Sequence, residues 1–159
     1  MSLKSQHVKL SPSCSNHMAT IRHIGLVARH TESLVRFYTR VFNLKVSDRR
    51  IETGSFIEKL VGIPDAQLEW AKLADANGII LEILHYRSQD DFGTTARDTT
   101  KPGAFHVAFT VEDAALVHHI VEQAGGGAGP LQTNPEGTVL VFYATDPEGN
   151  QIEIVQSLI

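Results

Sequence analysis

The sequence has few of the features that mark secreted, membrane-spanning or nucleic-acid-binding proteins. It contains a single cysteine, Cys14, so no disulfide can form within the chain, and a reducing compartment, the cytoplasm, is the expected location. No apolar run approaches the ~18 residues that a membrane span needs. The net charge of -4 gives no reason to expect nucleic acid or an anionic membrane as a partner. A composition of 42% hydrophobic and 20% charged residues is that of an ordinary globular protein.

The first 19 residues differ in character from the rest of the chain. Residues 1–19 are dominated by polar side chains and lack the apolar segment of a signal peptide. We therefore expect a poorly ordered tail there, with Cys14 as an exposed thiol that has no catalytic role.

The feature that organises the remaining residues is an internal repeat. Residues 20–27 and 104–111 are each predicted to form a strand. In each strand one histidine, His23 or His106, lies within a short apolar run. Only two copies are present, which favours a duplicated module that pairs with itself over a solenoid.

The pattern that follows each histidine is also repeated. A helix is predicted after each strand, where apolar residues recur at helical spacing, and then further strands. Helices are expected at 32–43 and 113–124, and strands at 45–51, 68–74, 79–86, 139–145 and 151–156. Asn77-Gly78 predicts a hairpin, and the sequence from Asp146 to Gly149 predicts a turn. Tight turns imply antiparallel pairing of the strands that they join.

Two modules of the type strand, helix, three strands account for this pattern, and the fold class is therefore α+β. The first βαβββ module is assigned to residues 20–86 and the second to 103–159, with a linker at 87–102. One helix covers only one face of a sheet of four strands. The uncovered faces of the two modules are expected to enclose a shared cleft, which would hold the functional site.

The last strands of the two modules carry a second matched pair of residues. Glu82 and Glu153 each lie among aliphatic residues at equivalent places in the repeat. Burying an unpaired carboxylate is costly, so each needs a partner. The simplest explanation is one divalent metal ion bound by His23, Glu82, His106 and Glu153. Two imidazoles and two carboxylates suit Zn, Ni, Co, Fe or Mn.

These motifs resemble those of the vicinal oxygen chelate superfamily, also described as glyoxalase/bleomycin-resistance/dioxygenase proteins. The resemblance rests on RHIGLV, LVRFYTRVFNL, LEIL, FHVAFTV and DPEGNQIE, at residues 22–27, 34–44, 81–84, 105–111 and 146–153. It implies paired modules that form an open, U-shaped mixed sheet around a central cleft with a metal, often in a homodimer. Pairing of the modules within one chain or across a dimer is left open by the sequence.

The resemblance also implies roles for individual residues. His23 and His106 match the ligands on the first strand of each half, Glu153 matches the ligand on the last strand, and Glu82 matches a fourth ligand position. That position is not a ligand in ring-cleaving dioxygenases, so a glutamate there favours lyase or isomerase chemistry, like that of a glyoxalase or an epimerase. The alternatives are an extradiol-type dioxygenase and a non-catalytic small-molecule-binding protein like the bleomycin-resistance relatives.

The expected reaction transfers a proton in a small oxygenated substrate. A metal ion would polarise a substrate oxygen and stabilise an enediolate or enolate. Glu82 or Glu153 would act as the catalytic base that removes the proton and returns it.

Overall fold

A computed structural model describes residues 19–89 and 99–159 of the chain. The tail predicted for residues 1–19, with Cys14, lies outside the described residues except for residue 19, and so does much of the linker predicted at 87–102. In the described part of the chain, no helix is long and apolar enough to cross a membrane.

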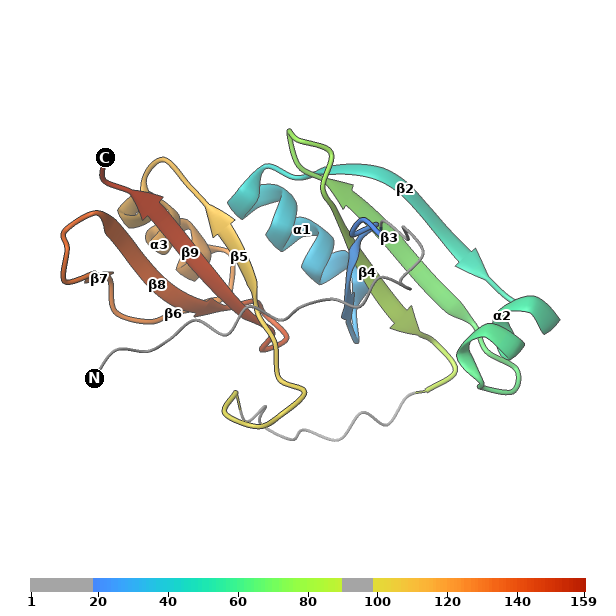
Figure 1. Cartoon of the computed structure of the whole chain (residues 1–159). Coiled ribbons are helices and arrows are strands. Elements are labelled where there is room, and N and C mark those ends of the chain that lie inside the picture. Colours follow the sequence, from blue (N-terminus) through green and yellow to red (C-terminus); the bar gives the residue numbers. More distant parts are fainter. Residues whose placement is uncertain (1–18, 90–98) are drawn as a thin grey trace, which may run out of the picture.

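The first module contains one mixed sheet and two helices (Figure 1). Its elements are β1 (Ile24–Val27), α1 (Thr31–Phe42), β2 (Lys45–Glu52), α2 (Ser55–Val61), β3 (Leu68–Ala74) and β4 (Ile80–Tyr86). The strand order is β1-β4-β3-β2, in which β1 runs parallel to β4 and the other pairs are antiparallel. The hairpin predicted at Asn77-Gly78 joins β3 to β4 and is confirmed.

The second module repeats this plan with a single helix. Its elements are β5 (Val107–Thr110), α3 (Ala114–Gln123), β6 (Gly127–Ala128), β7 (Gln132–Thr133), β8 (Val139–Thr145) and β9 (Gln151–Ser157). The strand order is β5-β9-β8-β6, with β5 parallel to β9 and β7 also paired to β8. The predicted α+β class, with paired modules and mixed sheets, is confirmed.

Helix α1 forms where the apolar residues recur every three to four positions. The side chains of Leu34, Phe37, Tyr38 and Val41 are buried on one side of the helix. The helix ends as predicted at Asn43, which adopts the left-handed conformation with φ 53°. Its beginning differs from the prediction.

A helix over the predicted residues 32–43 would have Thr31 as its N-cap residue, but Thr31 is the first helical residue, and His30 stands at the cap without a side-chain hydrogen bond. The cap comes instead from the other module. The carboxylate of Glu148 accepts hydrogen bonds from the backbone N–H groups of Arg29 (2.6 Å) and His30 (2.8 Å). A local sequence pattern cannot reveal a cap supplied from so far along the chain.

The two modules share one hydrophobic core, which lies on the helix-covered faces of both sheets. Leu73 and Ile83 of the first sheet and Phe142 and Ile154 of the second belong to the same buried cluster as residues of α1 and α3. Helix α1 contacts α3 and lies between the two sheets in Figure 1. Each sheet therefore turns its opposite face away from the shared core.

Side chains of α1 contact the second module at two places, the C-terminal end of the helix and its middle. The rings of Phe42 and Phe109 stack with centroids 3.9 Å apart. The hydroxyl of Tyr38 donates to the buried carboxylate of Asp146, 3.0 Å away. Burial raises the pKa of Asp146, although hydrogen bonds from Asn150, the backbone and Tyr38 favour its charged form.

A smaller core lies on the other face of the first sheet. Helix α2 places Ile57 against Leu68 and Trp70, with Tyr86 packed beside them. Helix α2 was not among the two helices predicted from the apolar spacing, which is too short here to distinguish a helical turn from a loop.

Candidate active site

The first pair of predicted ligands, His23 and Glu82, lies on the sheet face that α1 does not cover. Glu82 alternates along β4 with Leu81 and Ile83, which point into the shared core. Its own side chain therefore points to the opposite face, where it is 8% exposed. His23 precedes β1, and its Nε2 lies 3.1 Å from Oε2 of Glu82.

The second pair, His106 and Glu153, reproduces this arrangement in the other module. Glu153 alternates along β9 with the buried Ile152 and Ile154. His106 Nε2 lies 3.1 Å from Glu153 Oε2, the same separation as in the first pair. Gly25 is the register partner of Glu82 and Ala108 that of Glu153, so each histidine is two residues before the partner of its glutamate.

A lysine that the sequence reasoning did not select completes the surroundings of Glu82. Lys72 is the antiparallel register partner of Glu82 on β3, and its Nζ lies 3.4 Å from Glu82 Oε1. The same ammonium lies 4.2 Å from the ring centroid of Trp70, in a cation–π contact. Glu82 thus has a different partner at each carboxylate oxygen.

The equivalent position of the second module holds a different residue. Tyr143 is the register partner of Glu153 on β8, as Lys72 is of Glu82. Its ring meets that of His106 edge-on at 5.4 Å, and Tyr143 is 46% exposed. The two His–Glu pairs are alike, but their flanking residues are not.

The structure brings the four predicted ligands together as two pairs and not as one cluster. Among residues 19–89 and 99–159, no three His, Cys, Asp or Glu side chains gather in a group that could hold a metal ion. The reason is the shared core, because both sheets turn their glutamate-bearing faces away from it. The convergence of all four side chains expected around one point is therefore not found within a single chain.

The remaining described histidines have other surroundings. His85 lies on the face opposite to Glu82, as the alternation along β4 predicts. His118 contacts the backbone oxygen of Gly129 at 3.0 Å. His119 is exposed and contacts Gln123 at 2.8 Å. His118 also lies 3.9 Å from Glu122, four residues further along α3.

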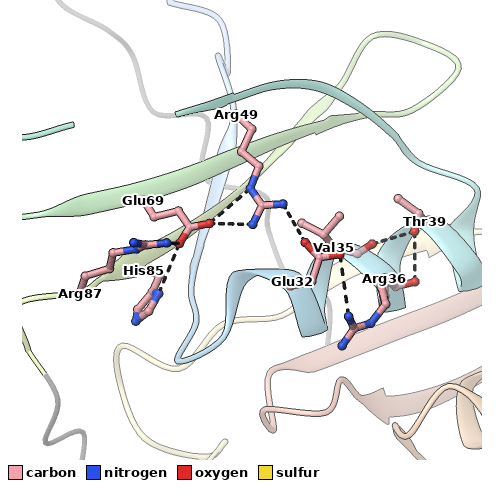
Figure 2. Close-up of polar contacts among 8 residues, drawn as sticks. All are labelled: Glu32, Val35, Arg36, Thr39, Arg49, Glu69, His85 and Arg87. Carbon is pink, nitrogen blue, oxygen red and sulfur yellow. Dashed lines mark hydrogen bonds and ion pairs between the residues drawn. The ribbon is translucent and has the colours of Figure 1, made fainter. Parts of the chain in front are cut away.

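A dense ionic cluster, also absent from the sequence reasoning, surrounds Glu69 on the α1 side of the first sheet (Figure 2). Oε1 of Glu69 accepts from Nη2 of Arg49 at 2.7 Å, and Oε2 accepts from Nη2 of Arg87 at 2.7 Å. Arg49 also bonds Glu32 of α1 at 2.7 Å, and His85 Nδ1 lies 3.8 Å from Glu69. Burial alone would raise the pKa of Glu69, but the hydrogen bonds from the two arginines hold that pKa below its ordinary value. The cluster joins three strands and α1.

Comparison with known proteins agrees with this fold. The sequence profile of the Glyoxalase/Bleomycin resistance protein/Dioxygenase superfamily matches residues 20–154, which include all four predicted ligands. The chain belongs to this superfamily. Lactoylglutathione lyases from serogroups A and B of Neisseria meningitidis are each 27% identical over 139 residues, covering 84% of this chain and 88% of theirs.

Solved structures of superfamily members show the same fold. A glyoxalase family protein from Bacillus cereus matches with a TM-score of 0.83 at 17% identity, over 92% of this chain and 99% of that chain. The fosfomycin resistance protein of Listeria monocytogenes matches with a TM-score of 0.59 at 14% identity, over 90% of this chain and 97% of that one. At these identities the likeness concerns the fold alone.

Proposed function

We propose that this superfamily member is a metal-dependent lyase or isomerase that acts on a small oxygenated substrate. The observation that carries the proposal is the pair of repeat-equivalent His–Glu contacts, each of 3.1 Å, on the sheet faces that α1 and α3 do not cover. The similarity to lactoylglutathione lyases supports chemistry of this kind.

The donor atoms fit a divalent ion of intermediate hardness. His23 and His106 would supply imidazole nitrogens, and Glu82 and Glu153 would supply carboxylate oxygens, a set that suits Zn, Ni, Co, Fe or Mn. Each module offers only two of these donors, whereas protein sites for such metals use three or four. A half-site of this kind is incomplete alone.

We propose that a second copy of the chain completes the site. In a symmetric dimer the first module of one copy can face the second module of the other, and symmetry then creates two identical sites. Each site would combine His23 and Glu82 of one chain with His106 and Glu153 of its partner. The uncovered faces, with the exposed Tyr143 and Val27, would become the walls of the cleft.

The metal ion and the glutamates would have different roles in the reaction. A bound metal ion would act as a Lewis acid toward a substrate oxygen. Glu82 or Glu153 would take a proton from the carbon next to that oxygen and return it to the same or the neighbouring carbon. The side chain of Glu82 is 10% exposed and that of Glu153 is 26% exposed, so water has less access to the first carboxylate than to the second.

Metal content of the native protein is the first test. Protein purified without chelators or nickel resin should contain about one divalent metal per chain, measured by inductively coupled plasma mass spectrometry. The double variant His23→Ala/His106→Ala should lose the metal, whereas His119→Ala, which removes an exposed histidine of α3, should retain it. Metal-free wild-type protein that also fails to take up Zn, Ni, Co, Fe or Mn would support a non-catalytic binding protein instead.

The type of reaction is tested by proton exchange. A lyase or isomerase of this kind should incorporate deuterium from heavy water at the carbon next to the carbonyl of small α-oxo compounds, followed by nuclear magnetic resonance. Oxygen consumption with catechols by iron-loaded protein, without such exchange, would identify a dioxygenase.

A further inference from the structure

Lys72 is the charged residue that breaks the symmetry between the two half-sites. Lys72 and Tyr143 occupy equivalent places, each the register partner of the glutamate of its module. The first sheet carries α2 on this face, and its half-site places a cation beside the glutamate, whereas the second half-site places a phenol there. The two half-sites therefore differ in the charge that they present to a bound ligand.

The ammonium of Lys72 is held in place and is still accessible. Its Nζ lies 4.2 Å from the centroid of the Trp70 ring and 3.4 Å from Oε1 of Glu82. These two contacts restrict its position. The Lys72 side chain nevertheless keeps 27% of its surface exposed, against 10% for Glu82. A cation that is fixed in advance loses little side-chain entropy on binding an anion, which strengthens binding.

The net charge of the assembled site also favours an anionic ligand. Two carboxylates cancel the charge of a divalent cation, and two neutral imidazoles add none. The ammonium of Lys72 would then leave the assembled site with an excess of positive charge, which favours an anionic ligand. Arg50 adds to this on the same sheet face, 5.8 Å from the Trp70 ring centroid, but it is paired with Asp48 at 3.2 Å.

We propose that Lys72 selects substrates that carry a carboxylate beside the reacting oxygen, such as small α-oxo or α-hydroxy acids. This inference rests on the proposed function, because it places the carboxylate next to the ion held by the His–Glu pairs. Lys72 acts as a specificity-determining residue that contacts the substrate anion.

The test compares two probes that differ in charge but have the same number of non-hydrogen atoms, pyruvate and pyruvamide. Their dissociation constants are measured by isothermal titration calorimetry on full-length wild-type protein, Lys72→Met, Lys72→Arg and Arg50→Met, with and without bound zinc, at one ionic strength. Methionine keeps an apolar chain over Trp70 while it removes the charge.

Wild-type protein should prefer pyruvate, and Lys72→Met should reduce that preference by roughly tenfold or more, since a hydrogen bond to a charged group is lost. The affinity for pyruvamide should change by less than about threefold. Lys72→Arg should keep most of the preference. Arg50→Met removes a charge from the same face without contact to Glu82, and should leave the preference within about twofold.

Two results would overturn the inference. One is a preference for pyruvate that Lys72→Met leaves unchanged, and the other is an equal loss of affinity for both probes, which a purely structural role would produce. Zinc stoichiometry, determined on the same samples, distinguishes failure of the inference about Lys72 from failure of the proposed metal site. Protein that binds no zinc refutes the metal site, yet its titrations still report whether Lys72 selects the carboxylate. Protein that binds zinc but neither probe refutes the inference and leaves the metal site standing.

Discussion

Glu82 is the residue on which the proposed chemistry depends most directly. One oxygen of its carboxylate contacts His23 and the other contacts Lys72, and the side chain is 10% exposed. A carboxylate with so little contact with water keeps its orientation through these two partners. A substitution that preserves shape but removes the charge can therefore separate its role as a base from its role as a ligand.

We expect Glu82→Gln to retain part of the bound metal and to lose proton exchange by about 100-fold or more, because an amide oxygen can still bind a cation but cannot accept the proton. Metal content and deuterium incorporation into an α-oxo substrate measure the two effects. Glu153→Gln is the matched variant in the other half-site. Undiminished exchange in Glu82→Gln would leave Glu153 as the base.

Glu69 offers a test of stability that is independent of the site. Its pKa is lowered in the folded protein, so the cluster contributes fully above the ordinary value of 4.5 and loses its contribution as the pH falls through the lower folded value. Glu69→Gln should lower the free energy of unfolding by about 1–3 kcal/mol at pH 7. The difference from wild type should shrink as the pH falls below 4.5.

Urea unfolding at one fixed protein concentration, repeated between pH 7 and pH 3, measures this difference. The control is Glu32→Gln, which also removes a partner of Arg49 but at a half-exposed position. It should cost less than about 1 kcal/mol. A loss for Glu69→Gln that stays constant with pH would show that its charge does not stabilise the fold.

Single residues were predictable from the sequence where the repeat made them comparable. The matched positions of His23 with His106 and of Glu82 with Glu153 led to both pairs. Lys72 was missed, although it and Glu82 lie at equal distances in sequence from Asn77 in the hairpin. The register of a hairpin places such residues side by side, so the sequence itself indicates that Lys72 lies next to Glu82. For Glu69 the same register indicates His85 alone, since the two arginines that bond it come from β2 and from beyond the end of β4.

At the scale of elements, helix α1 connects the two modules. Its buried side contributes to the shared core, its Tyr38 reaches Asp146, and its N-terminus is capped from the turn between β8 and β9. The amphipathic pattern predicted the helix and its end at Asn43. The pattern could not predict which surfaces the helix would join, because α3 or either sheet could satisfy the same apolar stripe.

Glu148→Ala should weaken this connection. The substitution removes the acceptor for the N–H groups of Arg29 and His30 and a negative charge at the N-terminus of α1. We expect a loss of about 1–2 kcal/mol in the free energy of unfolding. Hydrogen exchange should also show faster opening of the first turn of α1.

Glu136→Ala is the control for this variant, because it removes an exposed glutamate from another turn of the same module. Its effect should stay within about 0.5 kcal/mol. Equal effects of the two substitutions would show that the cap contributes nothing beyond the loss of a surface charge.

At the scale of the whole molecule, the same core that joins the modules also separates their half-sites. The stacked rings of Phe42 and Phe109 and the contact between α1 and α3 fix the uncovered faces away from the shared core. The sequence predicted two modules with matched ligands and a cleft between their uncovered faces, but it left open whether those faces meet within one chain or across a dimer. A lone chain with this arrangement cannot bring four donors to one ion, and a dimer resolves the conflict without rearranging the core.

Mixing two inactive variants tests this arrangement directly. The variant His23→Ala/Glu82→Ala lacks one half-site, and His106→Ala/Glu153→Ala lacks the other, so neither alone should bind metal. In a mixed dimer one site loses all four donors, while the other keeps all four, because its intact halves come from different chains. Random reassortment of equal amounts should restore about a quarter of the wild-type metal content, since half of the dimers are mixed and each holds one of two sites. Proton exchange should return to a similar extent. Mixing that restores neither metal nor exchange, although native mass spectrometry detects the mixed dimer, would place the four ligands within one chain and would require the core around α1 to open.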